Sequence, residues 1–257
     1  MTFGKIWIII VHVLTKKRLI NIMARKSRIN TKLQIKKVAL HLFLEKGFTN
    51  VAVSEISKEI GISKGNFTFH YATKEHLLTE LIKDLCEFQW LVMERELEEE
   101  NNPLLAYLFE LTTMAGSCYN NSVAKDLYIS AYTHPMSLRM IRENDTEKAQ
   151  KIFNEYCPDW MEKDFALAEN IVSGIEYAMF LAVHEEDITL DEKISATLDA
   201  IMKIYNVPKD IREESLKKIL AMDYCKIGQR ILGEFRDYVE QLNEKELEEA
   251  VLQNSRK

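Results

Sequence analysis

The chain has 257 residues, of which 47% are hydrophobic and 29% charged, enough for a substantial core in one large or two smaller domains. Eight glycines and four prolines leave few breaks between long stretches of helix-forming residues, which predicts an all-α protein. The cysteines indicate neither a disulfide framework nor a zinc site, because they are far apart and form no CxxC pair: Cys86, Cys118, Cys157 and Cys225.

The net charge of −6 is distributed unevenly along the chain. Residues 1–22 hold four Lys or Arg and no acid, and residues 23–77 hold ten against four acids. Residues 78–257 hold 20 basic residues against 36 acidic ones. A basic head on an acidic body indicates that a polyanion binds at one end of the molecule.

The first 22 residues contain an apolar run from Ile6 to Leu14. The run is far shorter than the roughly 20 residues of a membrane-spanning helix, and no small-residue cleavage site follows it. We therefore expect residues 1–22 to be a disordered or non-native extension before a natural start at Met23. The protein is then expected in the cytoplasm, and a membrane-tethered form using residues 1–22 is the alternative.

Apolar residues between 35 and 43 recur at helical spacing and predict a helix over residues 30–46, closed by Gly47. A second helix is expected over 53–60 and a third over 64–71. Gly61 supplies the turn between them and Ser63 the cap of the third helix. This order is that of a helix-turn-helix, whose second helix lies in the major groove of DNA. A structural helix pair joined by a glycine turn is the alternative.

Three segments carry a family resemblance: ALHLFLEKGF over 39–48, SEISKEIGISKGNFTFHY over 54–71 and TKEHLL over 73–78. They resemble the N-terminal domain of TetR-family transcriptional regulators. The resemblance and the outward positions of the third helix together predict these DNA-binding residues: Ser54, Ser63, Lys64, Gly65, Asn66, Thr68, Phe69, His70 and Lys74. The chain departs from the family at Val51 and Ala52, where a capping Thr or Ser is usual, and at Thr68, where many members have Tyr.

The DNA-binding domain is expected over residues 23–73, and a helical effector-binding and dimerisation domain over 74–242. Thr73 should cap a helix reaching about residue 100, and Asn102 with Pro103 should open the next. Further breaks are expected near residues 120–121, 134–135, 144–145 and 158. Two helical patterns cover 210–224 and 226–242, followed by a charged tail over 243–257.

The resemblance also implies an effector cavity in the helical domain. Apolar walls with a few polar tips are typical of small-molecule sites. The candidate lining residues are Tyr107, Met114, Cys118, Tyr128 and Tyr132. For each of them an ordinary place in the core is the alternative.

A helix expected over 163–185 carries small residues at four-residue spacing, which would let another helix approach closely. A second amphipathic helix follows it. The resemblance implies that this pair forms a four-helix dimer interface through Gly174, Ile175, Ala178, Ala182, Leu198, Ile201 and Tyr205. A packing face within one chain is the alternative.

No sequence motif of an enzyme is present: GxSxG, HExxH, a P-loop and GxGxxG after a strand are all missing. We expect no catalytic activity, no cofactor and no metal. The resemblance implies a homodimer that binds a pseudo-palindromic operator in double-stranded DNA and releases it on binding a small-molecule effector. A helical interaction protein that has lost DNA affinity is the alternative.

Overall fold

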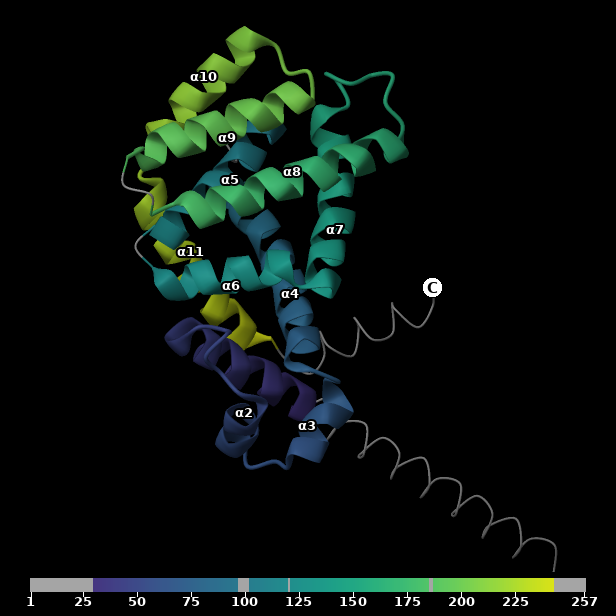
Figure 1. The fold of residues 1–257 in the computed structure, drawn as a ribbon, viewed down its shortest axis with the longest axis vertical. Coiled ribbons are helices and arrows are strands. Elements are labelled where there is room, and N and C mark those ends of the chain that lie inside the picture. The colour runs from purple at the N-terminus through teal and green to yellow at the C-terminus, as the bar shows by residue number, and fades with distance from the viewer. Residues whose placement is uncertain (1–29, 97–101, 120, 185–186, 243–257) are drawn as a thin grey trace, which may run out of the picture.

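The computed structural model describes residues 30–96, 102–119, 121–184 and 187–242. Throughout these residues the regular structure is helical, as the composition predicts. A small head lies at one end of a larger body (Figure 1). The predicted extension over 1–22 and the charged tail over 243–257 lie outside the described residues.

The head consists of a helix over residues 30–46, α2 (Val53–Ile60) and α3 (Lys64–His70). Gly47 and Gly61 end the first two helices with φ of 89° and 74°, in the left-handed region that favours glycine. With seven residues, α3 is too short to be stable alone. It is held instead by Phe67 and Tyr71, which are fully buried in the head.

The long helix α4 (Lys74–Glu96) belongs to both parts. Its cap is the predicted one, since the Thr73 hydroxyl accepts a hydrogen bond from the His76 amide at 3.1 Å. Two ion pairs fix the first half of α4 to the helix over 30–46: Lys32 to Glu80 at 3.1 Å and Lys36 to Asp84 at 2.6 Å. The second half packs against the body, so α4 connects the two parts rigidly.

The body surrounds α5 (Pro103–Tyr119), which is buried along most of its length and opens, as predicted, on the Asn102 cap. Around it lie α6 (Ser122–Thr133), α7 (Pro135–Phe153), α8 (Glu162–Ala182), α9 (Leu190–Ile204), α10 (Lys209–Leu220) and α11 (Tyr224–Gln241). Among the described residues, α8 is the helix that by length and composition alone could cross a membrane, and 44% of its apolar window is buried.

The break expected near residues 144–145 is wrong, because α7 continues through them. Asn and Asp are weak helix formers, which suggested an interruption. Their side chains instead bond to each other at 3.0 Å, and Asp145 lies 3.4 Å from the buried Lys148 ammonium. Side-chain contacts within α7 therefore offset the weak helix propensity of these two residues. The other expected breaks in this stretch are present, although residue 120 itself lies outside the described residues.

α5 and α11 cross closely enough for their backbones to approach each other, because each helix has a glycine at the crossing. A Cβ added to Gly228 of α11 would lie 2.2 Å from the Thr113 carbonyl oxygen, and one added to Gly116 of α5 would lie 2.7 Å from the Tyr224 carbonyl oxygen. Both neighbours are backbone atoms, which cannot move aside as a side chain can. The crossing therefore holds α5 and α11 together along the axis of the body.

This crossing predicts different effects for two alanine substitutions on α11. Gly228→Ala should lower the free energy of unfolding by about 1–3 kcal/mol, since the new methyl group overpacks the crossing. Gly233→Ala is the matched control, because nothing lies within 4 Å of its added Cβ. It should stabilise α11 slightly through helix propensity. Denaturant unfolding measures both, and equal stability of the two variants would contradict the crossing.

Candidate nucleic-acid interface and body cavity

The outward face of α3 carries exposed side chains and an exposed glycine. Lys64, Gly65, Asn66, Thr68 and Phe69 are exposed, and Phe69 keeps 63% of its surface accessible. His70, in the last turn, is half-buried, while Ser54 on α2 and Ser63 before α3 are exposed. The Ser63 hydroxyl oxygen accepts a hydrogen bond from the Asn66 backbone N–H at 3.1 Å and so caps α3. A cation, an amide and exposed backbone therefore lie together on one face.

Thr68 differs from the expected phosphate ligand. Its hydroxyl donates to the Gly65 carbonyl oxygen one turn earlier, at 3.0 Å. A hydroxyl has one proton to donate, so this bond must break before Thr68 can donate to a phosphate.

The missing cap at the start of α2 is confirmed. Ala52 occupies the N-cap position and makes no side-chain capping bond. An ion pair between Lys46 and Glu55, at 2.6 Å, instead fastens the first turn of α2 to the helix over 30–46.

Lys74 has a structural role that the sequence did not reveal. Its ammonium donates to the carbonyl oxygens of Phe48 and Val51 at 2.7 and 2.8 Å, and lies 4.2 Å from the centre of the Phe48 ring. Partial burial lowers the pKa of Lys74. Two of its three N–H groups thus hold the loop between the first two helices, and the third is left for the expected DNA contact.

A second contact missed at the sequence level joins the head to α6. The Asp126 carboxylate accepts two hydrogen bonds from Thr49, one from its backbone N–H at 2.9 Å and one from its hydroxyl at 2.8 Å. In Figure 1, α6 lies at the edge of the body nearest the head. A lone Asp on an amphipathic helix carries no sequence signal for such a role. The head is therefore attached to the body through α6 as well as α4.

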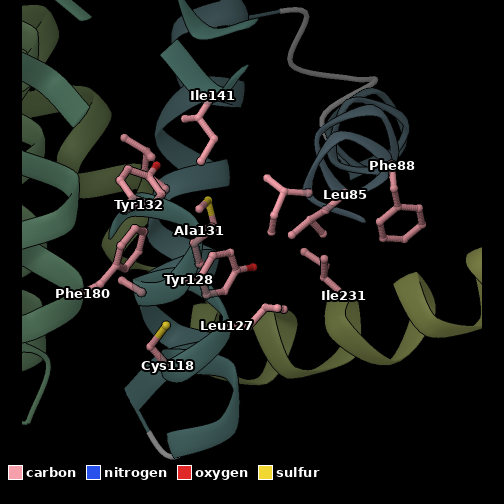
Figure 2. Packing of buried hydrophobic residues seen from close by; sticks show 14 of the residues in the cluster. Leu85, Phe88, Cys118, Leu127, Tyr128, Ala131, Tyr132, Ile141, Phe180 and Ile231 are labelled. Atoms are coloured by element: carbon pink, nitrogen blue, oxygen red, sulfur yellow. The ribbon is translucent and has the colours of Figure 1, made fainter. Parts of the chain in front are cut away.

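The body contains a small cavity of about 30 Å³, bounded by α4 to α8. Four of the five candidate residues line it, namely Tyr107, Met114, Tyr128 and Tyr132. Cys118 does not; it is buried toward the opposite end of the cluster from Ile141 (Figure 2). Whether the cavity binds an effector stays a prediction.

Polar side chains that the sequence analysis did not single out also face the cavity. Glu176 of α8 is 2% exposed and accepts hydrogen bonds from the Tyr132 hydroxyl at 2.8 Å and the Tyr107 hydroxyl at 3.4 Å. Burial, strengthened by the charges of Asp145 and Glu169, raises the pKa of Glu176 well above its usual range. The available signal was an acid in the apolar second half of α8.

A buried ion pair lies beside the cavity. The Lys148 ammonium donates to both carboxylate oxygens of Glu110, at 2.9 and 3.1 Å, and lies 5.2 Å from the centre of the Trp90 ring. Burial alone would lower the pKa of Lys148, but the charges of Glu110 and Asp145 outweigh it and raise the pKa. Lys148 is thus held as a cation whose charge is already compensated.

The predicted dimer residues divide into two groups. Leu198 and Ile201 of α9 and its C-cap residue Tyr205 are 0% exposed, and the Tyr205 ring stacks on Phe153 with 4.0 Å between ring centres. Their assignment to the dimer interface is wrong, because the apolar face of α9 packs inside one chain, the alternative given for this pair of helices. On α8, Gly174 and Ala178 are exposed.

Ile175 and Ala182 of α8 are half-buried. The outer surface of α8 also exposes large apolar side chains at Leu167, Ile171 and Leu181. The α8 half of the predicted interface therefore stays a prediction.

The geometry of α2, the Gly61 turn and α3 defines the head as a helix-turn-helix domain. Residues 35–81 match the family described as bacterial regulatory proteins, tetR family. The chain therefore carries a domain of the tetR family over these residues.

Curated relatives agree with this assignment. YuxN of Bacillus subtilis, an uncharacterized HTH-type transcriptional regulator, is 30% identical over 105 residues, covering 41% of this chain and 35% of YuxN. YerO of the same organism, also an uncharacterized HTH-type regulator, is 47% identical over 55 residues, covering 21% of this chain and 18% of YerO. This chain thus spans well under half the length of either. QacR of Staphylococcus aureus is 24% identical over 170 residues, covering 62% of this chain and 89% of QacR.

Solved structures share the fold beyond the head. RolR in complex with resorcinol matches with a TM-score of 0.58 and 18% identity, over 75% of this chain and 95% of RolR. RolR without ligand matches with a TM-score of 0.52 and 17% identity, over 72% of this chain and 95% of RolR. The likeness therefore extends to the body as a matter of fold.

The position of Lys74 predicts a stability effect in the head. Lys74→Met should lower the free energy of unfolding by about 1–3 kcal/mol, since the Phe48 and Val51 carbonyl oxygens lose their donor. Lys58→Met, at an exposed position of α2, is the matched control and should leave stability unchanged. Thermal unfolding measures both, and a Lys74 variant as stable as the control would refute the structural role.

Proposed function

We propose that the protein is a dimeric, sequence-specific DNA-binding transcriptional regulator, a repressor that a small-molecule effector releases from its operator. The observation that carries the proposal is the exposed face of α3, behind the Gly61 turn, in a head that matches the tetR family. A cation and an amide on this face suit base edges and phosphates of a major groove.

Two heads are needed for operator binding in this proposal. Two-fold symmetry of the dimer requires a pseudo-palindromic site, with one α3 in each of two successive major grooves. The exposed apolar surface of α8 supports a partner there, because Leu167, Ile171 and Leu181 are 54%, 59% and 46% exposed beside the small side chains of Gly174 and Ala178. We assign this surface to the second subunit.

The route from cavity to head runs through two of the cavity walls. α4 lines the cavity with Leu85 and is tied to the helix over 30–46 by Lys36 and Asp84. α6 lines it with Tyr128 and Tyr132 and reaches the head through Asp126. A ligand that favours another spacing of these walls would change the separation of the two heads. DNA affinity would then fall. The size of the fall is limited by how much more tightly the ligand binds the new head separation than the separation that fits the operator.

A ligand-binding role for this cavity is further supported by RolR, which has the same fold and was solved in complex with resorcinol. The matched curated relatives are transcriptional regulators, and we extend this class to the chain in place of an enzymatic function, with the cytoplasm as its location. A helical protein of this fold without DNA affinity is the second candidate. Salt dependence separates the two, because phosphate contacts make affinity fall steeply with salt.

Substitutions on α3 test the proposed groove contacts. Lys64→Ala and Asn66→Ala should each weaken operator binding by about 1–3 kcal/mol if the side chain reads a base through two hydrogen bonds. Lys151→Ala, at an exposed position of α7 in the body, is the matched control for charge. Fluorescence anisotropy on duplexes selected from a random pool measures the affinity. Unchanged binding by both α3 variants would remove the groove assignment, and failure to select any duplex would reject DNA binding.

A bulky substitution tests the dimer surface. Ala178→Trp should give monomers, because the indole overpacks a close approach between α8 helices. Ile188→Trp, at another exposed apolar position of the body, is the matched control and should leave the dimer intact. Sedimentation velocity distinguishes the species, and a stable dimer of the α8 variant would contradict the assignment.

A further inference from the structure

The cavity contains an acid that no basic side chain neutralises. Glu176 accepts hydrogen bonds from Tyr107 and Tyr132, and these are neutral donors. The nearby cations are engaged elsewhere: Lys148 by Glu110 and Asp145, and Arg142 by the Ser173 hydroxyl at 2.8 Å. Among the described residues, Glu176 therefore faces the cavity without a cationic partner.

The surroundings of Glu176 are themselves acidic. Glu169, two turns earlier on α8, accepts a bond from the Tyr205 hydroxyl, while its second carboxylate oxygen is buried without a hydrogen-bond partner. The titratable and charged groups that influence this region come from every wall: Cys86 of α4, Tyr107 and Glu110 of α5, Tyr132 of α6, Arg142, Asp145 and Lys148 of α7, Glu169 of α8 and Tyr205 of α9. Carboxylates outnumber cations in this set, which opposes an anionic ligand.

A second polar group faces the same cavity from α4. Gln89 is 6% exposed and lines the cavity. A side-chain amide can both donate and accept hydrogen bonds, so Gln89 suits a polar group of a bound ligand. The rest of the lining is mostly apolar and aromatic, with Leu85, Met114 and Tyr128 among its residues, and it also includes Glu110 and Asp145.

We propose that this cavity, widened by displacement of its walls, binds a small aromatic amine. Its protonated nitrogen pairs with Glu176 and its ring packs between the tyrosines, with any polar substituent facing Gln89. A cation between a carboxylate and tyrosine rings is stabilised by charge and by the ring faces together. This assignment rests on the proposed effector site, and names the chemical class of its ligand. A small neutral phenol, which could donate a hydrogen bond to Glu176, is the competing class.

The charge of Glu176 gives the proposal a pH signature. Burial raises the pKa of Glu176, and burial together with Asp145 raises the pKa of Glu169 to about 8. A bound cation favours the ionised carboxylate, so amine binding should release protons. Affinity should therefore rise with pH while the amine itself stays protonated. A neutral phenol would release no proton on binding.

Calorimetry with charge-matched probes tests the ligand class on the full chain without DNA. The amines are tyramine, phenethylamine and 1-naphthylmethylamine, each compared with the alcohol and the carboxylic acid of the same shape. At least one amine should bind about tenfold or more tightly than both of its isosteres, as expected for a charge-assisted hydrogen bond. Titration in buffers of different ionisation enthalpy should show the proton release. Binding of none of the amines, or equal binding of amine and alcohol, would overturn the proposal.

Substitutions locate the amine within the cavity. Glu176→Gln keeps the shape and removes the charge, so the preference for amine over alcohol should fall to about one and proton release should stop. Glu147→Gln, at an exposed position of α7, is the matched control and should keep both. Thermal unfolding of each variant confirms folding. Should Glu176→Gln not fold, the wild-type isostere ratios and proton release still decide the class. A preference retained in a folded Glu176→Gln variant would place the amine elsewhere.

The failure of this assignment can be told apart from failure of the proposed function. The bound amine is added to the complex of the protein with its selected duplex, and DNA release is followed by anisotropy. An amine that binds without releasing DNA leaves the ligand class standing and rejects effector control. DNA release by a neutral phenol, with no binding of the amines, would support effector control and reject the amine.

Discussion

The structure depends above all on the attachment of α4 to the head. Lys36 and Asp84 meet at 2.6 Å with both side chains largely buried, and an ion pair buried in this way is costly to break by removing one partner. Lys32 and Glu80 add a second pair one turn away. The first half of α4 therefore moves with the head, while its second half forms a wall of the body. A change in the cavity can reach α3 without any bend in the head itself.

The head followed from the sequence because local signals decide it. Gly47 and Gly61 end their helices where the chain needs a left-handed residue, and Ser63 and Thr73 cap theirs. The missing cap at Ala52 was also evident from the sequence. The roles of Lys74 and Asp126 could not be predicted in this way, since their partners lie 23 to 77 residues away along the chain. Such contacts follow from tertiary packing, which one sequence does not reveal.

The body was predictable in its elements and less so in its faces. Helical spacing identified α8 and α9. The family resemblance assigned the apolar face of α9 to a partner subunit, although Leu198, Ile201 and Tyr205 fill the core of one chain. Periodicity shows that a face is buried and cannot say against what. The break expected at Asn144 and Asp145 failed because Asp145 lies beside Lys148, three residues along α7. Lys148 itself is held by Glu110, 38 residues away in the sequence. The same limitation hid Glu176 and Gln89.

The glycine crossing of α5 and α11 makes the body unequally stiff. With Gly228 against the backbone of Thr113, α5 has no room to move toward α11, and it forms a fixed wall of the cavity. α4 and α6, on other sides of the cavity, have no comparable crossing with α11 among the described glycines. Expansion of the cavity would therefore be directed toward α4 and α6, which both bond to the head. α11 also bonds to the head, where the Lys37 ammonium donates to the Glu240 carbonyl oxygen. α11 would thus stay in place with α5 while α4 and α6 move, and this would set the direction of a small displacement inside the body.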